Sequence, residues 1–314
     1  MSGIFGIVGP VFLTILIGYL ARRFNRISAD GLRGLNDFVF MLALPALLFE
    51  GATSSGGLGA TVAVSVAYFA ACIPVYLLAV LVGWKLRRLR LQEAGLFGLD
   101  ASYGNLSMVG IPVVLAAYGQ EGLHNLLAIL AFHSILLLPI ATVIAEFGIN
   151  RNASLLQVFR STATSLLSNP VVLAVAAGGL WSLLMPPLPD VLRNLLHMLG
   201  SAVSPVALFC LGASLTGFNI RRDWPNAVIG TVIKLLVLPA IVWVVAIMLK
   251  LPPLGTAVAV TAAATPTGAN AFILARRYAT GMDRSGATVL LASGLSLVTL
   301  SLIVSLLVLR SAPG

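Results

Sequence analysis

Residues 100–119, DASYGNLSMVGIPVVLAAYG, are the most informative stretch of this chain. The stretch lies within a long apolar segment, yet it carries Asp100 and Asn105 and is interrupted by Gly-Ile-Pro at 110–112. Proline in a helix interior removes a backbone hydrogen bond and clashes with the preceding turn. Broken backbone at membrane depth is tolerated only inside protein or beside a water-filled cavity. We therefore expect a broken membrane helix at a functional cavity.

A second interrupted stretch lies far downstream, at residues 261–278, TAAATPTGANAFILARRY. Two broken hydrophobic segments at corresponding places in two halves of a chain indicate a transporter binding site. A helix that begins at such a break exposes backbone N–H groups and a positive dipole end, which bind anions. We expect a carboxylate site where the two breaks meet. The alternative is a pair of kinked helices that pack in a bundle.

Composition places the chain among polytopic membrane proteins. Of its 314 residues, 59% are hydrophobic and 9% are charged, and the mean hydropathy is +1.03. Soluble domains are about a quarter charged. The net charge of +9 comes from basic clusters between apolar runs, which fits membrane topology better than nucleic-acid binding. Cys72 and Cys210 lie in apolar segments without metal or redox spacing. We expect no enzyme, no cofactor and no metal site.

The apolar runs predict ten membrane spans, since a span needs about 20 apolar residues. The connection at 148–168 separates five spans within residues 1–147 from five within 169–314. The expected spans are 3–21, 32–51, 61–84, 95–118, 124–147, 169–186, 194–217, 227–249, 256–277 and 285–309.

Lysine and arginine predict the orientation, because cytoplasmic loops carry an excess of both. Fifteen lie on one side of the ten expected spans and three on the other, and Lys234 lies within a span. This bias places both termini on the non-cytoplasmic side. The fifteen are Arg22, Arg23, Arg26, Arg33, Lys85, Arg87, Arg88, Arg90, Arg151, Arg160, Arg221, Arg222, Arg276, Arg277 and Arg284, and the three are Arg193, Lys250 and Arg310.

The two halves of the chain are related by a shift of about 160 residues. The shift superimposes Pro10 on Pro170, Gly18 on Gly178, Pro45 on Pro205 and Phe49 on Phe209. Five spans per repeat is an odd number, so the second repeat begins on the opposite side of the membrane. The pattern predicts inverted repeats, a common transporter design.

Three ionisable residues lie well inside expected spans. Asp100 and Lys234 lie at similar depths, and a charge in the bilayer usually pairs or lines a cavity. We expect them to balance charge and helix dipoles, either by pairing with each other or by binding the ends of the broken helices. His133, in the fifth span, is interpreted as a packing residue. Whether Asp100 or His133 titrates during transport is open.

Two asparagines are candidates for the site. The amide of Asn105 can donate to a carboxylate, although a hydrogen bond between helices is the alternative. Asn169 precedes Pro170 at the start of the sixth span, where helix capping explains it.

Three strings resemble the auxin efflux carrier family, which includes the plant PIN-FORMED carriers and bacterial malate and malonate permeases. They are NLSMVGIP at 105–112, ALPALLF at 43–49 and TPTGANAFILA at 265–275. The resemblance implies an all-α fold of two inverted five-helix repeats, similar to bile-acid symporters and sodium–proton antiporters. It also implies a scaffold of helices 1, 2, 6 and 7, a transport core of helices 3–5 and 8–10, and crossing broken helices 4 and 9.

The resemblance further implies that Pro112, Pro266 and Asn105 surround a substrate carboxylate, with Asn169 as the nearest match to a sixth-helix asparagine. Taken with the two breaks, the expected substrate-binding residues are Asn105, Gly110, Ile111, Pro112, Pro266, Thr267, Gly268, Asn270 and Asn169.

The expected function is that of a secondary carrier, which moves small mono- or dicarboxylates by elevator-type alternating access. The short connection at 148–168 resembles bacterial members, so we expect the inner membrane as location and a native substrate other than auxin. Expected partners are the organic anion, the lipid bilayer and a second copy bound through the scaffold helices, and nucleic acid is not among them. Two alternatives stay open: a sodium- or proton-coupled symporter or antiporter, and a membrane sensor. Substrate identity, coupling ion, direction and oligomeric state are open as well.

Overall fold

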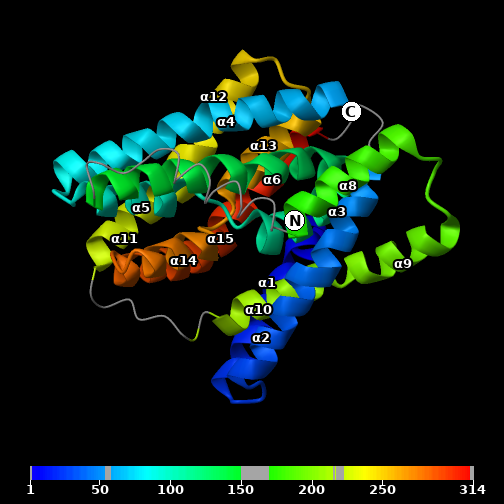
Figure 1. The fold of residues 1–314 in the computed structure, drawn as a ribbon, viewed down its shortest axis with the longest axis horizontal. Coiled ribbons are helices and arrows are strands. Elements are labelled where there is room, and N and C mark those ends of the chain that lie inside the picture. Colours follow the sequence, from blue (N-terminus) through cyan, green and yellow to red (C-terminus); the bar gives the residue numbers. More distant parts are fainter. Residues whose placement is uncertain (1, 54–57, 150–169, 215, 217–222, 312–314) are drawn as a thin grey trace.

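The computed structural model describes residues 2–53, 58–149, 170–214, 216 and 223–311 (Figure 1). The regular structure of these residues is helical, and four π-helical segments, labelled η, continue or begin α-helices. The elements are α1 (Ser2–Arg23), α2 (Ala29–Phe38), η1 (Val39–Ala43), α3 (Leu44–Thr53), α4 (Leu58–Leu81), η2 (Val82–Leu86), α5 (Leu91–Ser102), η3 (Leu106–Gly110), α6 (Ile111–Ile149), α8 (Pro170–Leu184), α9 (Asp190–Ser201), α10 (Val203–Ser214), α11 (Trp224–Val232), η5 (Ile233–Val237), α12 (Leu238–Met248), α13 (Pro253–Ala264), α14 (Ala269–Arg277) and α15 (Met282–Ser311).

Six helical stretches among the described residues are long and apolar enough to cross a membrane. Two shorter apolar helices accompany them, at Leu173–Leu184 and Pro253–Ala264. The expectation of an all-helical chain with several membrane spans therefore agrees with the structure. The six stretches are Ala29–Thr53, Val62–Leu86, Leu106–Ile149, Asp190–Ser214, Trp224–Met248 and Met282–Val308.

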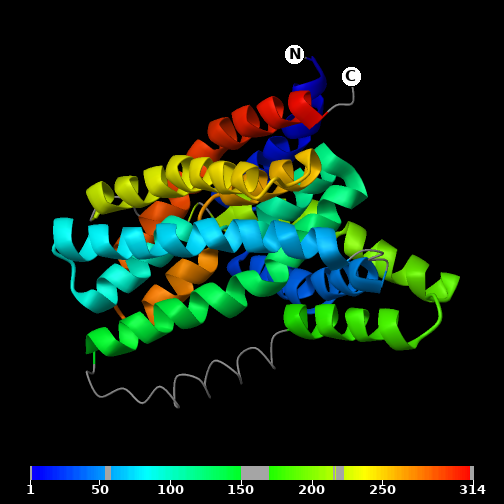
Figure 2. The same cartoon turned by 90° about the horizontal axis from the view of Figure 1, so that it is seen from above.

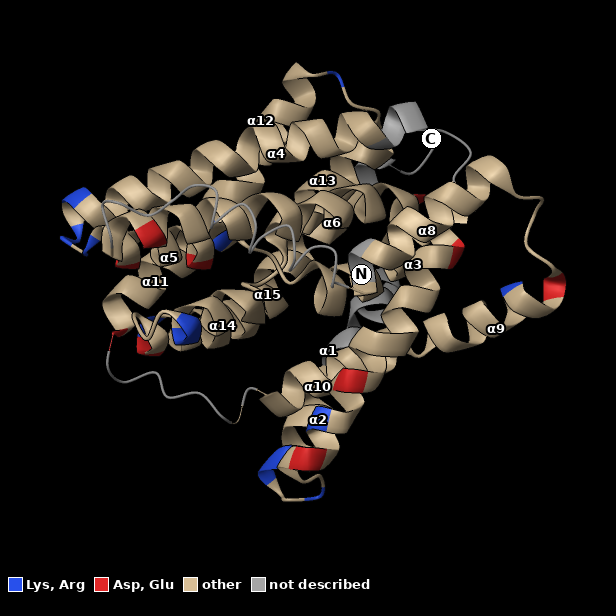
Figure 3. Ribbon diagram, in the orientation of Figure 1, with Lys and Arg blue, Asp and Glu red and all other residues tan. Residues whose placement is uncertain are grey.

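The outer surface is that of a protein in lipid. Large apolar side chains such as Leu77, Leu183, Met198 and Leu302 are exposed along the helices. Soluble monomers rarely expose contiguous apolar surface on this scale. Figure 3 shows the charged residues mainly at helix ends and turns, including the end of α4 and the start of α2.

The helices form two packing groups. In the smaller group, α1 packs against α10, and α3 packs against α8 and α9. In the larger group, α4 packs against α5, α6 and α12, while α15 packs against α11 and α13. Figure 1 shows α2, α3, α9 and α10 together at the lower right and the larger group to the left, and Figure 2 shows the same helices from above.

Three prolines follow π-helical segments. η1 ends two residues before Pro45, η3 ends two residues before Pro112, and η5 ends two residues before Pro239. A π turn widens the helix and lengthens the hydrogen-bond step, so the proline ring avoids the carbonyl it would strike in a regular α-helix. Each proline then lies in the first turn of the α-helical segment that follows the π turn. These prolines are built into continuous helices.

Two contacts between the halves are reciprocal. A methyl group on Gly18 would lie 2.0 Å from the carbonyl oxygen of Phe209, and one on Gly178 would lie 2.7 Å from that of Phe49. Glycine is therefore required at both helix contacts, because backbone approaches backbone. The four residues are those that the shift of 160 superimposes, so each half makes the same close contact with the other.

A shift of 162 residues relates the larger packing group to itself. It superimposes the last residue of α5, Ser102, on the last residue of α13, Ala264, and the two helices have 12 residues each. It also superimposes Gly119, at the bend of α6, on Gly281, before α15, and both have a φ of +64°. A positive φ is readily adopted only by glycine. These two local features therefore recur at one offset in the sequence.

Candidate functional site

The fourth expected span is interrupted at Tyr103–Asn105, between α5 and η3. Tyr103 leaves the helix with φ −76° and ψ 110°, and Asn105 begins the next segment as its N-cap. The expectation of a break at 110–112 is wrong by about two turns: Gly110 ends η3, and Ile111 and Pro112 form the first turn of α6. The physical reason is the π turn, which accommodates Pro112 without a break.

The ninth expected span is interrupted from Thr265 to Gly268, between α13 and α14. Thr265 is extended, with φ −60° and ψ 148°. This is the conformation that a residue before proline prefers, so Pro266 ends α13. The Thr265 hydroxyl closes the end of the helix by donating to the Ala262 carbonyl, at 2.7 Å.

The two interruptions pair with each other through their backbones. Gly104 and Thr267 form an antiparallel bridge. The Asn105 N–H donates to the Pro266 carbonyl at 2.8 Å, and the Gly268 N–H donates to the Tyr103 carbonyl at 2.9 Å. Backbone groups that leave a helix at membrane depth must find partners inside the protein, and here each break supplies them to the other.

Gly104 makes this close approach sterically feasible. A methyl group there would lie 2.5 Å from Thr265 Oγ1 and 3.4 Å from the Ala262 carbonyl oxygen. The Gly104 N–H donates to His133 Nε2 at 3.1 Å, which ties the bridge to α6. The glycine and the histidine therefore set the position of the first break.

A cavity of about 350 Å³ opens beside the paired breaks. It lies at the boundary between the two packing groups, since residues of both line it. The larger group contributes Tyr103, Gly104, Asn105, Leu106, Ser107, Met108, Leu130, His133, Gly268, Ala269, Asn270, Ile273 and Val289, and the smaller group contributes Asn36, Phe40, Leu211 and Ser214.

Two helix N-termini meet at this cavity. η3, which runs into α6, begins at Leu106, and α14 begins at Ala269. The first N–H groups of a helix have no partner within it, and the aligned peptide dipoles make that end positive. Neither Lys, Arg, Asp nor Glu is among the residues that line the cavity. The local potential therefore comes from backbone dipoles.

Asn105 has one end of its amide occupied and the other free. Its Oδ1 accepts from the Met108 N–H at 3.2 Å, as an N-cap residue does. Its Nδ2 makes no hydrogen bond to the residues that the structure describes. The amide thus offers N–H donors at the cavity. Asn270, which also lines the cavity, donates from Nδ2 to Tyr103 Oη at 2.8 Å and so holds the two breaks together.

His133 is more than a packing residue. It is 1% exposed, and its ring lies 4.5 Å from the Tyr103 ring, centroid to centroid. Because Nε2 accepts a hydrogen bond, the proton of the neutral ring is on Nδ1. Nδ1 has no hydrogen-bond partner in the described part of the chain. An unpaired buried donor costs free energy, which a bound group or water would recover.

Asp100 and Lys234 do not pair with each other. Asp100, fully buried, binds Arg284, with Nε 3.0 Å from Oδ2, and accepts from Ser285 Oγ at 2.5 Å. The Lys234 ammonium donates to the carbonyls of Ala263 and Thr265, at 2.5 and 2.6 Å. Of the two arrangements expected from the sequence, pairing of the two residues with each other is not found. Lys234 instead binds the end of a broken helix, which is the other arrangement.

Arg284 has a role that its place in the sequence does not suggest. The charge pattern predicts a cytoplasmic connection there, but Arg284 lies in the first turns of α15 and is 1% exposed. The signal for its role is Asp100 itself, since a buried carboxylate requires a cationic partner. Thr267 Oγ1 donates to the backbone carbonyl of Asp100 at 2.7 Å, so this hydrogen bond connects the second break to the end of α5 that carries Asp100.

The other expected site residues have different positions. Gly110, Ile111 and Pro112 are buried behind the first break and do not line the cavity. Pro266 supplies a backbone acceptor, and Gly268 and Asn270 line the cavity. Asn169 lies outside the described residues.

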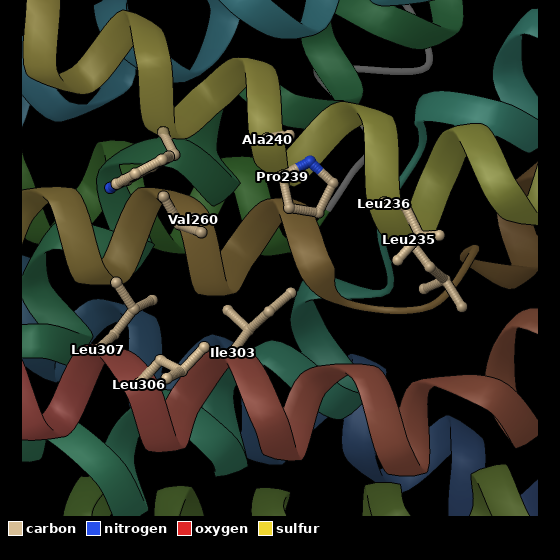
Figure 4. A pocket seen from close by; sticks show the side chains of 9 residues that line it. Leu235, Leu236, Pro239, Ala240, Val260, Ile303, Leu306 and Leu307 are labelled. Carbon is tan, nitrogen blue, oxygen red and sulfur yellow. The ribbon is translucent and has the colours of Figure 1, made fainter.

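A second cavity has almost entirely apolar surroundings (Figure 4). It has a volume of about 290 Å³ and lies between η5, α12, α13 and α15. Its lining offers no charged group and suits a lipid chain better than an anion. The lining residues are Leu235, Leu236, Pro239, Ala240, Trp243, Val260, Ile303, Leu306 and Leu307.

Known proteins resemble this chain over most of its length. A Rhizobium meliloti (strain 1021) protein named "Putative malonate transporter" is 28% identical over 314 residues, which cover 96% of this chain and 95% of the relative. "Uncharacterized transporter MJ1031" of Methanocaldococcus jannaschii is 25% identical, over 73% of this chain and 75% of the relative. The mouse "Lysosomal cholesterol signaling protein" is 30% identical over 73% of this chain, but over 28% of its own length.

The family described as "Membrane transport protein" matches residues 4–304. The match includes both breaks, the cavity and both packing groups. This chain is therefore a transporter and not an enzyme, and it belongs to the membrane transport protein family of auxin efflux carriers.

Proposed function

We propose that the protein is a secondary carrier of small organic anions, with mono- or dicarboxylates as substrates. The observation that carries the proposal is the cavity at which two helix N-termini meet, lined by Asn105 and His133 and by no charged side chain. Helix N-termini bind carboxylates and phosphates without a cationic residue.

The donors around the cavity favour an anion. The first N–H groups of η3 and α14 and the Asn105 amide are hydrogen-bond donors at the cavity. A volume of about 350 Å³ is at the small end of ligand sites, which supports a compact substrate. The name of the Rhizobium meliloti relative includes malonate, a short dicarboxylate, which makes malonate the first substrate to test.

The proposed architecture has ten membrane passes in two inverted repeats of five, with broken helices that cross at the paired interruptions. The reciprocal contacts of Gly18 and Gly178 support the repeat, as do the equal positive φ angles of Gly119 and Gly281. The distribution of lysine and arginine supports an orientation with both termini on the non-cytoplasmic side of a bacterial inner membrane.

The proposed mechanism is an elevator. The smaller packing group acts as the scaffold, and the larger group carries the paired breaks and moves past it. The cavity supports this mechanism because it lies at the boundary of the two groups, with Phe40 and Leu211 on one side and the breaks on the other. Movement along this boundary would expose the bound anion to each side of the membrane in turn.

The test is uptake of labelled carboxylates into proteoliposomes. We expect saturable uptake of malonate or another member of a panel of mono- and dicarboxylates. Asn105→Asp keeps the acceptor that caps η3 but replaces the free N–H donors with a negative charge. It should abolish uptake. The control is Asn125→Asp, which should leave uptake unchanged, because the Asn125 amide donates to the Glu121 carbonyl and does not line the cavity.

Absence of uptake for the whole panel, by protein shown to be folded, would contradict the proposed function. Normal uptake by Asn105→Asp would contradict the proposed site alone.

A further inference from the structure

Lys234 is buried completely, and its ammonium is held by backbone oxygens. Nζ donates to the carbonyls of Ala263 and Thr265 at 2.5 and 2.6 Å. Both carbonyls lie at the C-terminal end of α13, where the last carbonyls of a helix have no partner within it and the dipole is negative. The ammonium therefore satisfies orphan carbonyls at the second break.

No carboxylate of the described residues lies within ion-pair distance of Lys234. The fully buried carboxylate of Asp100 is occupied by Arg284 and Ser285. The positive charge of Lys234 is thus balanced by peptide dipoles. Such carbonyls at the C-terminal end of a broken helix are what transporters use to hold a free monovalent cation.

The corresponding position in the first half carries no charge. The shift of 162 residues superimposes Cys72 on Lys234, just as it superimposes the end of α5, Ser102, on the end of α13. The Cys72 Sγ lies 3.9 Å from the Ser102 carbonyl oxygen, and a thiol is a weak, neutral donor. The chain thus places a cation at one of two equivalent helix ends.

We propose that the Lys234 ammonium is a tethered cation, which permanently fills a monovalent-cation site at the end of α13. Transport of the anion then requires no sodium at this crossing. The absence of a sodium requirement in transport rests on the proposed carrier function. Whether Lys234 fills the cation site can be tested without a substrate.

The first test removes the Lys234 side chain and supplies a free amine in its place. Lys234→Ala leaves two buried carbonyls without a donor and removes three methylene groups and the ammonium, which n-propylammonium matches. The variant should melt at a lower temperature than the wild type in detergent, and millimolar propylammonium should raise its melting temperature by several degrees, on the scale of one recovered buried hydrogen-bonding group. Tetramethylammonium, which has no N–H donor, should not.

The matched control is Cys72→Ala, the same change at the equivalent position. Propylammonium should leave its melting temperature unchanged. Equal stabilisation of both variants, or no stabilisation of Lys234→Ala, would overturn the proposal.

The second test uses the wild type, so it holds even if Lys234→Ala fails to fold. Replacing sodium by N-methylglucamine should leave its melting temperature unchanged and should change anion uptake by less than about twofold, since a filled site gives no binding linkage. Uptake or stability that requires sodium would overturn the tethered cation but leave the carrier function intact. Absence of carboxylate uptake would instead contradict the carrier function. The melting temperatures with and without propylammonium would then still show whether Lys234 fills a cation site.

Discussion

Removing either partner of the buried ion pair between Asp100 and Arg284 should destabilise the fold strongly, because the remaining charge would be left buried and uncompensated. Asp100→Asn removes the negative charge and turns an amide toward the Arg284 Nε, which lies 3.0 Å from Oδ2. The side chains are 0% and 1% exposed, so water cannot compensate. Breaking a buried pair by removing one partner costs about 3–5 kcal/mol. We expect Asp100→Asn and Arg284→Met each to destabilise by that amount.

The double change should cost clearly less than the two single changes together. It leaves no uncompensated charge, and Ser285 can still donate to the Asn side-chain oxygen. We expect a coupling energy of about 1–3 kcal/mol between the two positions. The assay is thermal unfolding of purified protein in detergent, in which each single change should lower the melting temperature by on the order of 10 °C.

The exposed pair between Asp30 and Arg33 provides the control. Its side chains are 88% and 75% exposed, so Asp30→Asn should shift the melting temperature little. Simple additivity of the effects of Asp100→Asn and Arg284→Met, or effects no larger than that of the control, would show that the two side chains are not a coupled buried pair.

Three further changes test the packing and the first break. Gly18→Ala should destabilise by about 1–3 kcal/mol because its methyl group would lie 2.0 Å from the Phe209 carbonyl oxygen. Gly34→Ala, which meets no atom within 4 Å on the exposed face of α2, should not destabilise, since alanine favours the helix; thermal unfolding measures both. Gly104→Ala should reduce uptake by separating the bridged breaks, and unchanged uptake would contradict the tight pairing. Asn105→Ser should keep the melting temperature, since serine also caps, but weaken substrate affinity by about 1–3 kcal/mol; wild-type affinity would remove the Asn105 donors from the site.

Much of this organisation can be predicted from the sequence because hydrophobic runs and special residues carry it. Pro266 fixes an extended residue before it, so the second break is recognisable at 266–268. The glycines at 18 and 178 and the phenylalanines at 49 and 209 recur at one offset in the sequence, and in the fold they form the two close helix contacts.

The rest depends on interactions that a single sequence does not display. A proline such as Pro112 usually breaks a helix, but here the π turn that precedes it lets the helix continue. The sequence does not predict this, because π turns have no distinct residue pattern. The true break contains Gly104 and Asn105, and its position depends on Thr265 and His133 from other parts of the chain. Arg284 looks like a loop residue in sequence, and only the fold brings it to Asp100.

The proposed carboxylate site lies between the starts of η3 and α14. It can be tested by protection of a cysteine placed in the cavity, Ser107→Cys, against a small thiol reagent. Ser107 lines the cavity, and the native Cys72 and Cys210 are buried, so labelling reports the new thiol. We predict that malonate, or the carboxylate with the highest uptake, slows labelling and that half-maximal protection occurs at the concentration of half-maximal uptake. Labelling at an unchanged rate under saturating substrate would contradict the proposed site.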